Sequence, residues 1–178
     1  VTGNVFMVME SDNVAGSTMT LSGPISGAAK VTALNNGKGT LNEGKLLLTE
    51  DNSGFSGTWD LTVYSQKYPS VSGYVTTIEG SSENAFGKGS IVAGFENKVI
   101  FSHSKAAGDS LVLTLNDDAK AVLNTTVIVK KMVLNGSALE PGEYSAATHS
   151  EFFEGAGKIM VGESGGVVEP DEDLPAFP

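Results

Sequence analysis

Cysteine and arginine are both missing from this chain of 178 residues. The absence of cysteine excludes disulfides and thiolate metal centres. All 11 basic residues are lysine, so the chain lacks the bidentate fork that enzymes acting on phosphates and other anions commonly use. The formal net charge of −10, with no basic stripe, argues against nucleic acid as a partner.

Long apolar runs and helical windows are also missing. No run approaches the roughly 18 apolar residues of a membrane-spanning helix, so no transmembrane segment is expected. The best helical candidate, Asp117 to Leu123, is short and lies between strand-like runs. Aromatic residues make up 7% of the chain, whereas glycine occurs 22 times. This composition is typical of an all-β protein with many short strands and turns.

The most informative segment that is present runs from Asn36 to Val63. It predicts a strand at Lys45 to Thr49, a polar corner at Glu50 to Gly57, and a second strand at Thr58 to Val63. In the second strand Trp59, Leu61 and Val63 alternate with polar residues, which is the period of a half-buried strand. We interpret the Gly/Asn/Ser corner as a geometric feature rather than a chemical site.

Other strands are expected at short spacing along the chain, at Val5 to Met9, Thr18 to Leu21, Lys30 to Leu34, Tyr74 to Ile78, Gly89 to Ala93, Lys98 to Phe101, Ser110 to Leu115, Ala121 to Leu123, Thr126 to Leu134 and Lys158 to Val161. This spacing fits a right-handed parallel β-helix (a β-solenoid) or, alternatively, a β-sandwich. The recurring strand-turn theme at 18–23, 39–44 and 111–116 favours the solenoid, with coils of about 20–25 residues.

Turn chemistry and composition divide the remainder of the chain. Asn135-Gly136 predicts a two-residue hairpin, and Pro141-Gly142 fits the central pair of a type II turn. Phe152 and Phe153 are expected to insert into the core. Residues 1–164 are predicted to form the solenoid domain, and residues 165–178 an extended, acidic, proline-rich tail.

Several of these motifs resemble the autotransporter-associated β-strand repeat. The similarity rests on Gly39-Thr-Leu41, on Asn52-Ser-Gly-Phe-Ser-Gly-Thr-Trp59, on Asn84 to Ile91, and on a terminal group at 132–137, 139–144 and 155–161. The resemblance implies a right-handed parallel β-helix that is exported, and an adhesive, surface-layer or scaffold role. The first residue is Val1 rather than Met, which suggests processing or trimming, for instance removal of a signal peptide.

Catalytic and metal-binding signatures are weak. His103 and His149 lack partners at metal-ligand spacing and are expected in exposed loops, and no Gly-x-Ser-x-Gly elbow is present. Acidic clusters at 50–51, 117–118 and 169–173 could serve Ca²⁺ or glycan cleavage, but without a calcium motif solvated corners are the better interpretation. We therefore expect no catalytic, cofactor or metal residues. Core packing is favoured over a sugar-stacking platform for Trp59, Tyr64, Tyr68 and Tyr74.

The two ends of the predicted stack are the strongest functional candidates, because a solenoid must cap or use its open edges. The residues expected at an assembly interface are Val5, Phe6, Met7, Val8, Val167, Val168, Leu174 and Phe177. The hypothesis is head-to-tail assembly into a filament with the tail as a clasp. A tail that packs back on its own domain is the open alternative.

The sequence thus predicts a non-enzymatic structural or adhesive protein, a homo-oligomer or polymer located outside the cell or on a bacterial surface. Glycans or a host surface are further candidate partners. The alternatives are a carbohydrate-binding or carbohydrate-cleaving β-helix, against which the missing arginine argues, and a β-sandwich binding module.

Overall fold

The computed structural model describes residues 3–9, 17–35, 42–62, 74–108 and 110–162. These residues form 16 β-strands and contain no helix, and therefore no helix long and apolar enough to cross a bilayer. The expectation of an all-β protein is confirmed. The tail at 165–178, and with it the predicted domain boundary, lies outside the described residues.

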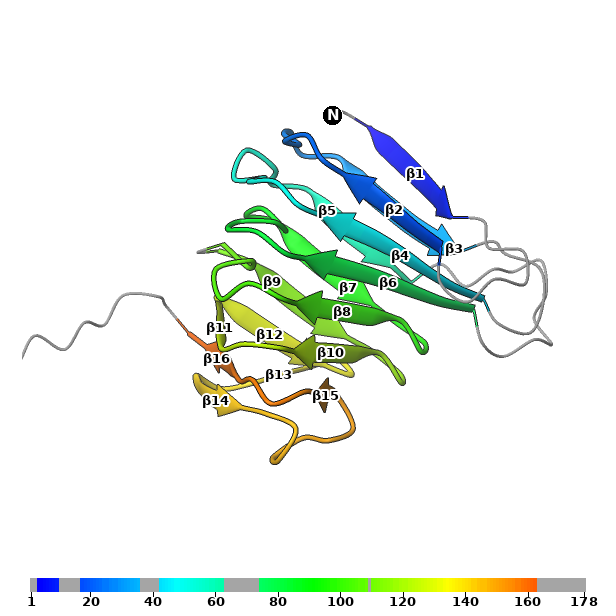
Figure 1. The fold of residues 1–178 in the computed structure, drawn as a ribbon. Coiled ribbons are helices and arrows are strands. Elements are labelled where there is room, and N and C mark those ends of the chain that lie inside the picture. Colours follow the sequence, from blue (N-terminus) through cyan, green and yellow to red (C-terminus); the bar gives the residue numbers. More distant parts are fainter. Residues whose placement is uncertain (1–2, 10–16, 36–41, 63–73, 109, 163–178) are drawn as a thin grey trace, which may run out of the picture.

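Strands close in sequence alternate between two large sheets (Figure 1). The first sheet has the order β1-β3-β5-β7-β9-β12-β13, with the bounds Asn4–Met9, Lys30–Asn35, Thr58–Leu61, Ser90–Ala93, Val112–Leu115, Lys131–Leu134 and Ser137–Ala138. The second has the order β15-β10-β8-β6-β4-β2, with the bounds Phe153–Glu154, Lys120–Leu123, Lys98–Phe101, Tyr74–Gly80, Asn42–Leu48 and Ser17–Leu21. A third, smaller sheet holds β11 (Val127–Val129), β16 (Ile159–Val161) and β14 (Gly142–Tyr144).

Pairing is parallel in both large sheets except at β13, which pairs antiparallel with β12. In the third sheet β14 is antiparallel to β16. An ordinary antiparallel β-sandwich, the alternative fold, would instead pair neighbouring strands through hairpins. We call one strand of the first sheet and the following strand of the second a rung.

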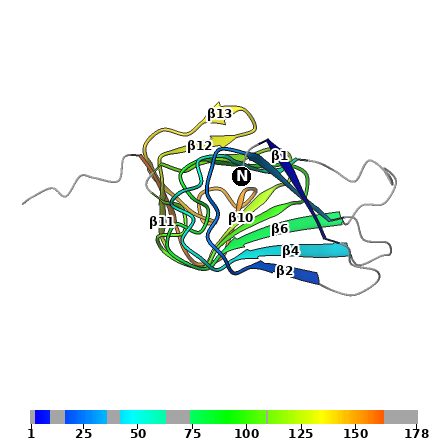
Figure 2. The same ribbon diagram turned by 90° about the horizontal axis from the view of Figure 1, so that it is seen from above.

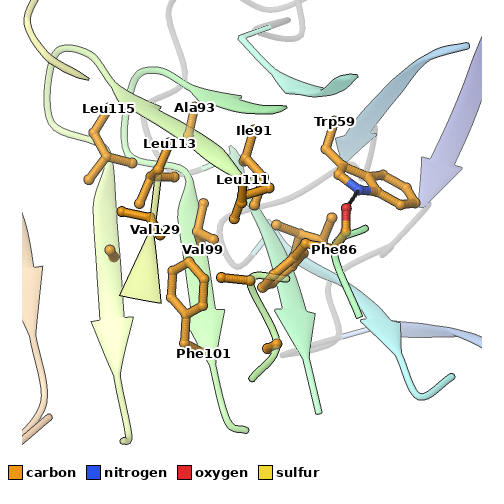
Figure 3. Packing of buried hydrophobic residues seen from close by; sticks show 14 of the residues in the cluster. Trp59, Phe86, Ile91, Ala93, Val99, Phe101, Leu111, Leu113, Leu115 and Val129 are labelled. Carbon is orange, nitrogen blue, oxygen red and sulfur yellow. Dashed lines mark hydrogen bonds between the residues drawn. The ribbon is translucent and has the colours of Figure 1, made fainter. Parts of the chain in front are cut away.

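Because the strands pair in register, inward-facing side chains of neighbouring strands lie on top of one another in columns. One inward column is Val31, Trp59, Ile91, Leu113 and Met132, and the opposite one is Leu46, Ile78, Val99, Ala121 and Phe153. All ten are buried. Figure 3 shows part of this core, with Trp59 Nε1 donating to the carbonyl oxygen of Phe86 at 3.0 Å. Period-two alternation thus produces a continuous apolar interior.

Spacing between paired strands varies along the stack. Ser90 pairs with Val112 and Lys98 with Lys120, 22 positions apart, which fits the predicted coil length. Thr58 pairs with Ser90, 32 positions on, because β5 ends at Leu61 and β6 begins only at Tyr74. Insertions between strands therefore lengthen some rungs without changing the register of the sheets.

Two local predictions were wrong. The single strand expected at Thr126 to Leu134 is two strands in different sheets, because Lys130 and Lys131 are both exposed and break the alternation where the chain changes direction. Gly142 lacks the positive φ of a type II turn and opens β14 instead. The hairpin is confirmed, since Asn135 and Gly136 have φ of 45° and 80° and join the antiparallel pair β12 and β13. Phe152 and Phe153 are buried as expected.

The corner at 50–57 is held by contacts between rungs. The buried Asn52 accepts a hydrogen bond from Ile25 N at 2.7 Å and donates one to the carbonyl oxygen of Ala85 at 2.6 Å, which lie in the preceding and following corners. A Cβ at Gly57 would overlap the carbonyl oxygen of Ala29 and approach the ring of Phe55 to 2.7 Å. Asn52 therefore serves to connect neighbouring corners through hydrogen bonds, and Gly57 is needed because the backbones approach closely there.

We predict that Gly57→Ala lowers the free energy of unfolding by about 1–3 kcal/mol, as overpacking does. Gly23→Ala is the matched control, because a Cβ there meets no atom within 4 Å. Urea denaturation of both variants provides the measurement. Equal stability of the two variants would contradict the packing account of this corner.

Candidate assembly site at the amino-terminal end

The first rung, β1 and β2, forms one end of the stack. β1 pairs only with β3 and β2 only with β4, so each is the outermost strand of its sheet in the described part of the chain. Figure 2 looks down on this end, with β1 and β2 on different sides of the stack. Six and five residues of backbone respectively are presented at these edges. Such edges offer unpaired N–H and C=O groups to another strand.

Strand β1 is apolar on both of its faces. Phe6 and Val8 point outward and are 65% and 42% exposed, so they are two of the four large hydrophobic side chains that are exposed among the described residues. Val5 and Met7 point inward and pack against the core. A strand that is apolar on both faces is typical of the middle of a sheet rather than its edge.

A hollow of about 450 Å³ opens between the two edge strands. Its walls are mainly apolar and include Val5, Met7, Leu21, Pro24 and Ile25. In deeper rungs the equivalent space is filled by buried side chains such as Trp59 and Leu46. The amino-terminal end therefore exposes an interior-like surface.

Charged side chains are absent from the first rung as the structure describes it, residues 3–9 and 17–29. Proteins ordinarily protect exposed edges with lysine, proline, bulges or very short strands. β1 carries none of these, whereas the carboxyl-terminal strands β13, β15 and β14 have only two, two and three residues. The two ends of the stack thus differ in their capacity to pair.

The structure brings together part of the predicted assembly interface. Val5, Phe6, Met7 and Val8 lie together on β1. The other four members, Val167, Val168, Leu174 and Phe177, lie outside the described residues. The hollow adds Leu21, Pro24 and Ile25, which we did not predict from the sequence. The available signal was the lack of any charged residue from Asn13 to Ala29.

The two histidines, His103 and His149, have structural contacts. Both are half-buried rather than exposed, contrary to expectation. His103 Nδ1 accepts a hydrogen bond from Lys105 N at 3.2 Å. His149 lies between Tyr144 and Phe153, with ring centroids 5.3 and 6.2 Å away, and packs the last loop.

The remaining sequence candidates occupy structural positions. Trp59 is fully buried, as the core-packing interpretation predicted, and cannot stack on a sugar. Among the described residues, no group of three or more His, Asp or Glu side chains is placed to hold a metal ion. Of the acidic clusters, 50–51 and 117–118 lie at corners, and 169–173 falls outside the described part. Tyr64 and Tyr68 also fall outside it.

Two carboxylates on the outer faces of the sheets are bound by lysine. Asp60 contacts Lys30 Nζ at 2.5 Å and accepts hydrogen bonds from Thr62 N and Oγ1. Glu79 contacts Lys45 Nζ at 2.7 Å and accepts from Ser102 Oγ at 2.8 Å. Burial acts to raise both pKa values, but the lysine and hydroxyl hydrogen bonds outweigh it, so that both pKa values lie below the usual carboxyl range. These carboxylates are ionised and join neighbouring strands.

Comparison with known proteins identifies no relative. No protein-family model matches the chain, and no curated protein or solved structure is significantly similar to it. The resemblance to the autotransporter-associated repeat therefore stays a prediction that rests on the motifs alone.

The Lys30–Asp60 pair generates a pH prediction. Because the pKa of Asp60 is lower in the folded protein, the pair stabilises the fold above the unfolded-state pKa of about 3.9, and this stabilisation is lost as the pH falls through the folded-state value. Asp60→Asn should thus be less stable than the wild type near pH 7, and the difference should shrink below about pH 4.

Urea denaturation at several pH values tests this, with Asp118→Asn at an exposed turn as the control that should keep the wild-type profile. A stability difference for Asp60→Asn that is independent of pH would show that the ion pair is not its cause.

Proposed function

We propose that this protein is a structural or adhesive right-handed β-solenoid, exported to the cell surface or the extracellular space, which self-associates through its amino-terminal end. The solenoid is supported by strands that alternate between two sheets and pair in parallel with the strand two or more positions on. Export rests on the resemblance of the sequence motifs. Self-association is supported by the open edges of β1 and β2 and by the apolar hollow at the amino-terminal end.

One observation carries the proposal: a six-residue edge strand that is uncharged and apolar on both faces beside an apolar hollow. Exposed apolar patches rimmed by polar residues mark interaction sites. A strand added to β1 would satisfy its free backbone groups and cover Phe6 and Val8 at the same time. The gain therefore comes from hydrogen bonding and from apolar burial together.

Growth beyond a pair of molecules needs a second adhesive end. The described carboxyl-terminal strands are short, and short edges pair poorly. In the head-to-tail filament expected from the sequence, residues 165–178 would act as the clasp. That arrangement is the expectation from the sequence, and its clasp lies beyond the described residues.

No observation among the described residues favours the carbohydrate-active alternative. Asp60 and Glu79, the carboxylates with the strongest contacts, lie in different sheets, and each is bound by its own lysine. We therefore advance no glycan-cleaving or glycan-binding role.

We predict that Phe6→Lys weakens self-association by at least about tenfold in dissociation constant, or 1.4 kcal/mol. The ammonium group would have to lose its water in a contact whose described residues, 3–9 and 17–29, offer no opposite charge. Ile128→Lys is the matched control, because Ile128 is 44% exposed on β11 in the third sheet. Light scattering after size-exclusion chromatography, across a concentration series, provides the measurement.

A wild-type chain that stays monomeric throughout the series would contradict self-association. An equal loss of association in Phe6→Lys and Ile128→Lys would instead place the contact elsewhere.

A further inference from the structure

The proposed self-association leaves open what covers the amino-terminal end. We propose that the occupant is the same end of a second copy, related to the first by a two-fold axis perpendicular to the stack. This inference rests on the proposed function, and three features of the described residues select it over a head-to-tail contact.

The first feature is charge. The chain carries a formal net charge of −10, so two copies repel one another overall. The first rung, residues 3–9 and 17–29, carries no charged side chain. The strands and turns at the opposite end carry Glu140, Glu143, Glu151 and Glu154, of which Glu143 is paired with Lys158 and Glu154 with Lys98. A head-to-tail contact would remove water from these carboxylates against an apolar surface, which is costly. A contact between the described residues of two first rungs buries no charged side chain.

The second feature is the number of open edges. Among the described residues, β1 and β2 each lack a partner on their outer edge at the same end, so a single added strand would cover one edge and leave the other exposed. Another first rung has two open edges of six and five residues and covers both at once. The carboxyl-terminal strands, with two or three residues each, match neither length.

The third feature is direction. Figure 1 shows β1 and β2 running in opposite directions. A two-fold axis perpendicular to the stack therefore brings an antiparallel partner to each edge, whether β1 meets β1 or β2 of the second copy. Antiparallel ladders are slightly more stable per residue than parallel ones. The hollows of the two copies then face each other, and the apolar side chains that line them become a shared core.

This contact has a direct consequence for assembly. A two-fold contact is isologous and closes on itself, so the amino-terminal ends alone yield a dimer. A head-to-tail contact is heterologous and, when it does not close into a ring, yields a filament. The dimer would double the length of the stack and leave both of its outer ends with short, paired strands.

Spin labels can distinguish the two arrangements, because the absence of cysteine allows one label per chain. Ala28→Cys places a label in the first rung, and Ala138→Cys places one on β13 at the other end; both positions are exposed. Six strand intervals of about 4.8 Å separate β1 from β13, so the stack is roughly 30 Å long. Distances between labels on the two copies are measured by pulsed electron paramagnetic resonance.

We expect the Ala138 labels to lie roughly twice this stack length apart, and the Ala28 labels to lie much closer together than the Ala138 labels. Similar distances for the two labels would overturn the two-fold contact in favour of head-to-tail association, while self-association itself would stand. A shorter distance for Ala138 than for Ala28 would place the contact at the carboxyl-terminal end and overturn the inference as well. Exclusively monomeric protein would overturn both this inference and the proposed function.

Deletion of residues 165–178 provides a second, independent variant. In the two-fold arrangement the truncated chain keeps the dissociation constant of the full chain, because the tail takes no part in the contact. Conversion of the truncated chain to monomers, with unchanged urea denaturation, would show that the tail is the clasp and would overturn the two-fold contact.

Discussion

Parallel pairing in register is the constraint on which the rest of this structure depends. Each strand of the two large sheets lies against the strand of the next rung, so every inward side chain rests on the inward side chain above it. Apolar residues at these positions exclude water from the stack beyond the hollow at its amino-terminal end. The corners must then superimpose as closely as the strands do, which leaves little room for side chains at Gly57 and selects Asn52 for its ability to bond two neighbouring corners.

The same constraint makes the two ends of the molecule unequal. A rung inside the stack has both of its edges paired, whereas the first and last rungs each have a free side. The last rung is covered by the hairpin at Asn135-Gly136 and by short strands, two of which take part in antiparallel pairs. The first rung has long open edges, exposed Phe6 and Val8, and an apolar hollow. The described part of the first rung thus offers backbone groups for strand pairing and an apolar surface for burial.

Polar groups within the stack support its geometry. Asn97 accepts a hydrogen bond from Thr76 N and donates to the carbonyl oxygen of Leu61, and so ties the end of β5 to the beginning of β6. The lysine pairs of Asp60 and Glu79 cross from one strand to its neighbour. These groups are satisfied within the fold, which is the usual condition for buried polar atoms. None of them is directed at a ligand.

The local features of the chain were predicted well because they depend on short-range chemistry. Alternation placed Trp59 and Leu61 on the buried face, and Asn135-Gly136 formed the expected hairpin. Prediction failed where two local signals were equally good. From Val127 to Leu134 two apolar runs flank Lys130 and Lys131, and the structure places the two runs in different sheets.

In the candidate assembly site, too, some features follow from the local sequence and others only from the tertiary structure. The sequence by itself determined the all-β class, the hairpin at Asn135-Gly136 and the apolar run at Val5 to Val8, because alternation and turn propensity act over a few residues. Only the tertiary structure decided that this run is an edge, that β2 is a second edge beside it, and that Leu21, Pro24 and Ile25 line a hollow between them. Being first in a stack is a property of long-range pairing, and no residue carries it in its own chemistry.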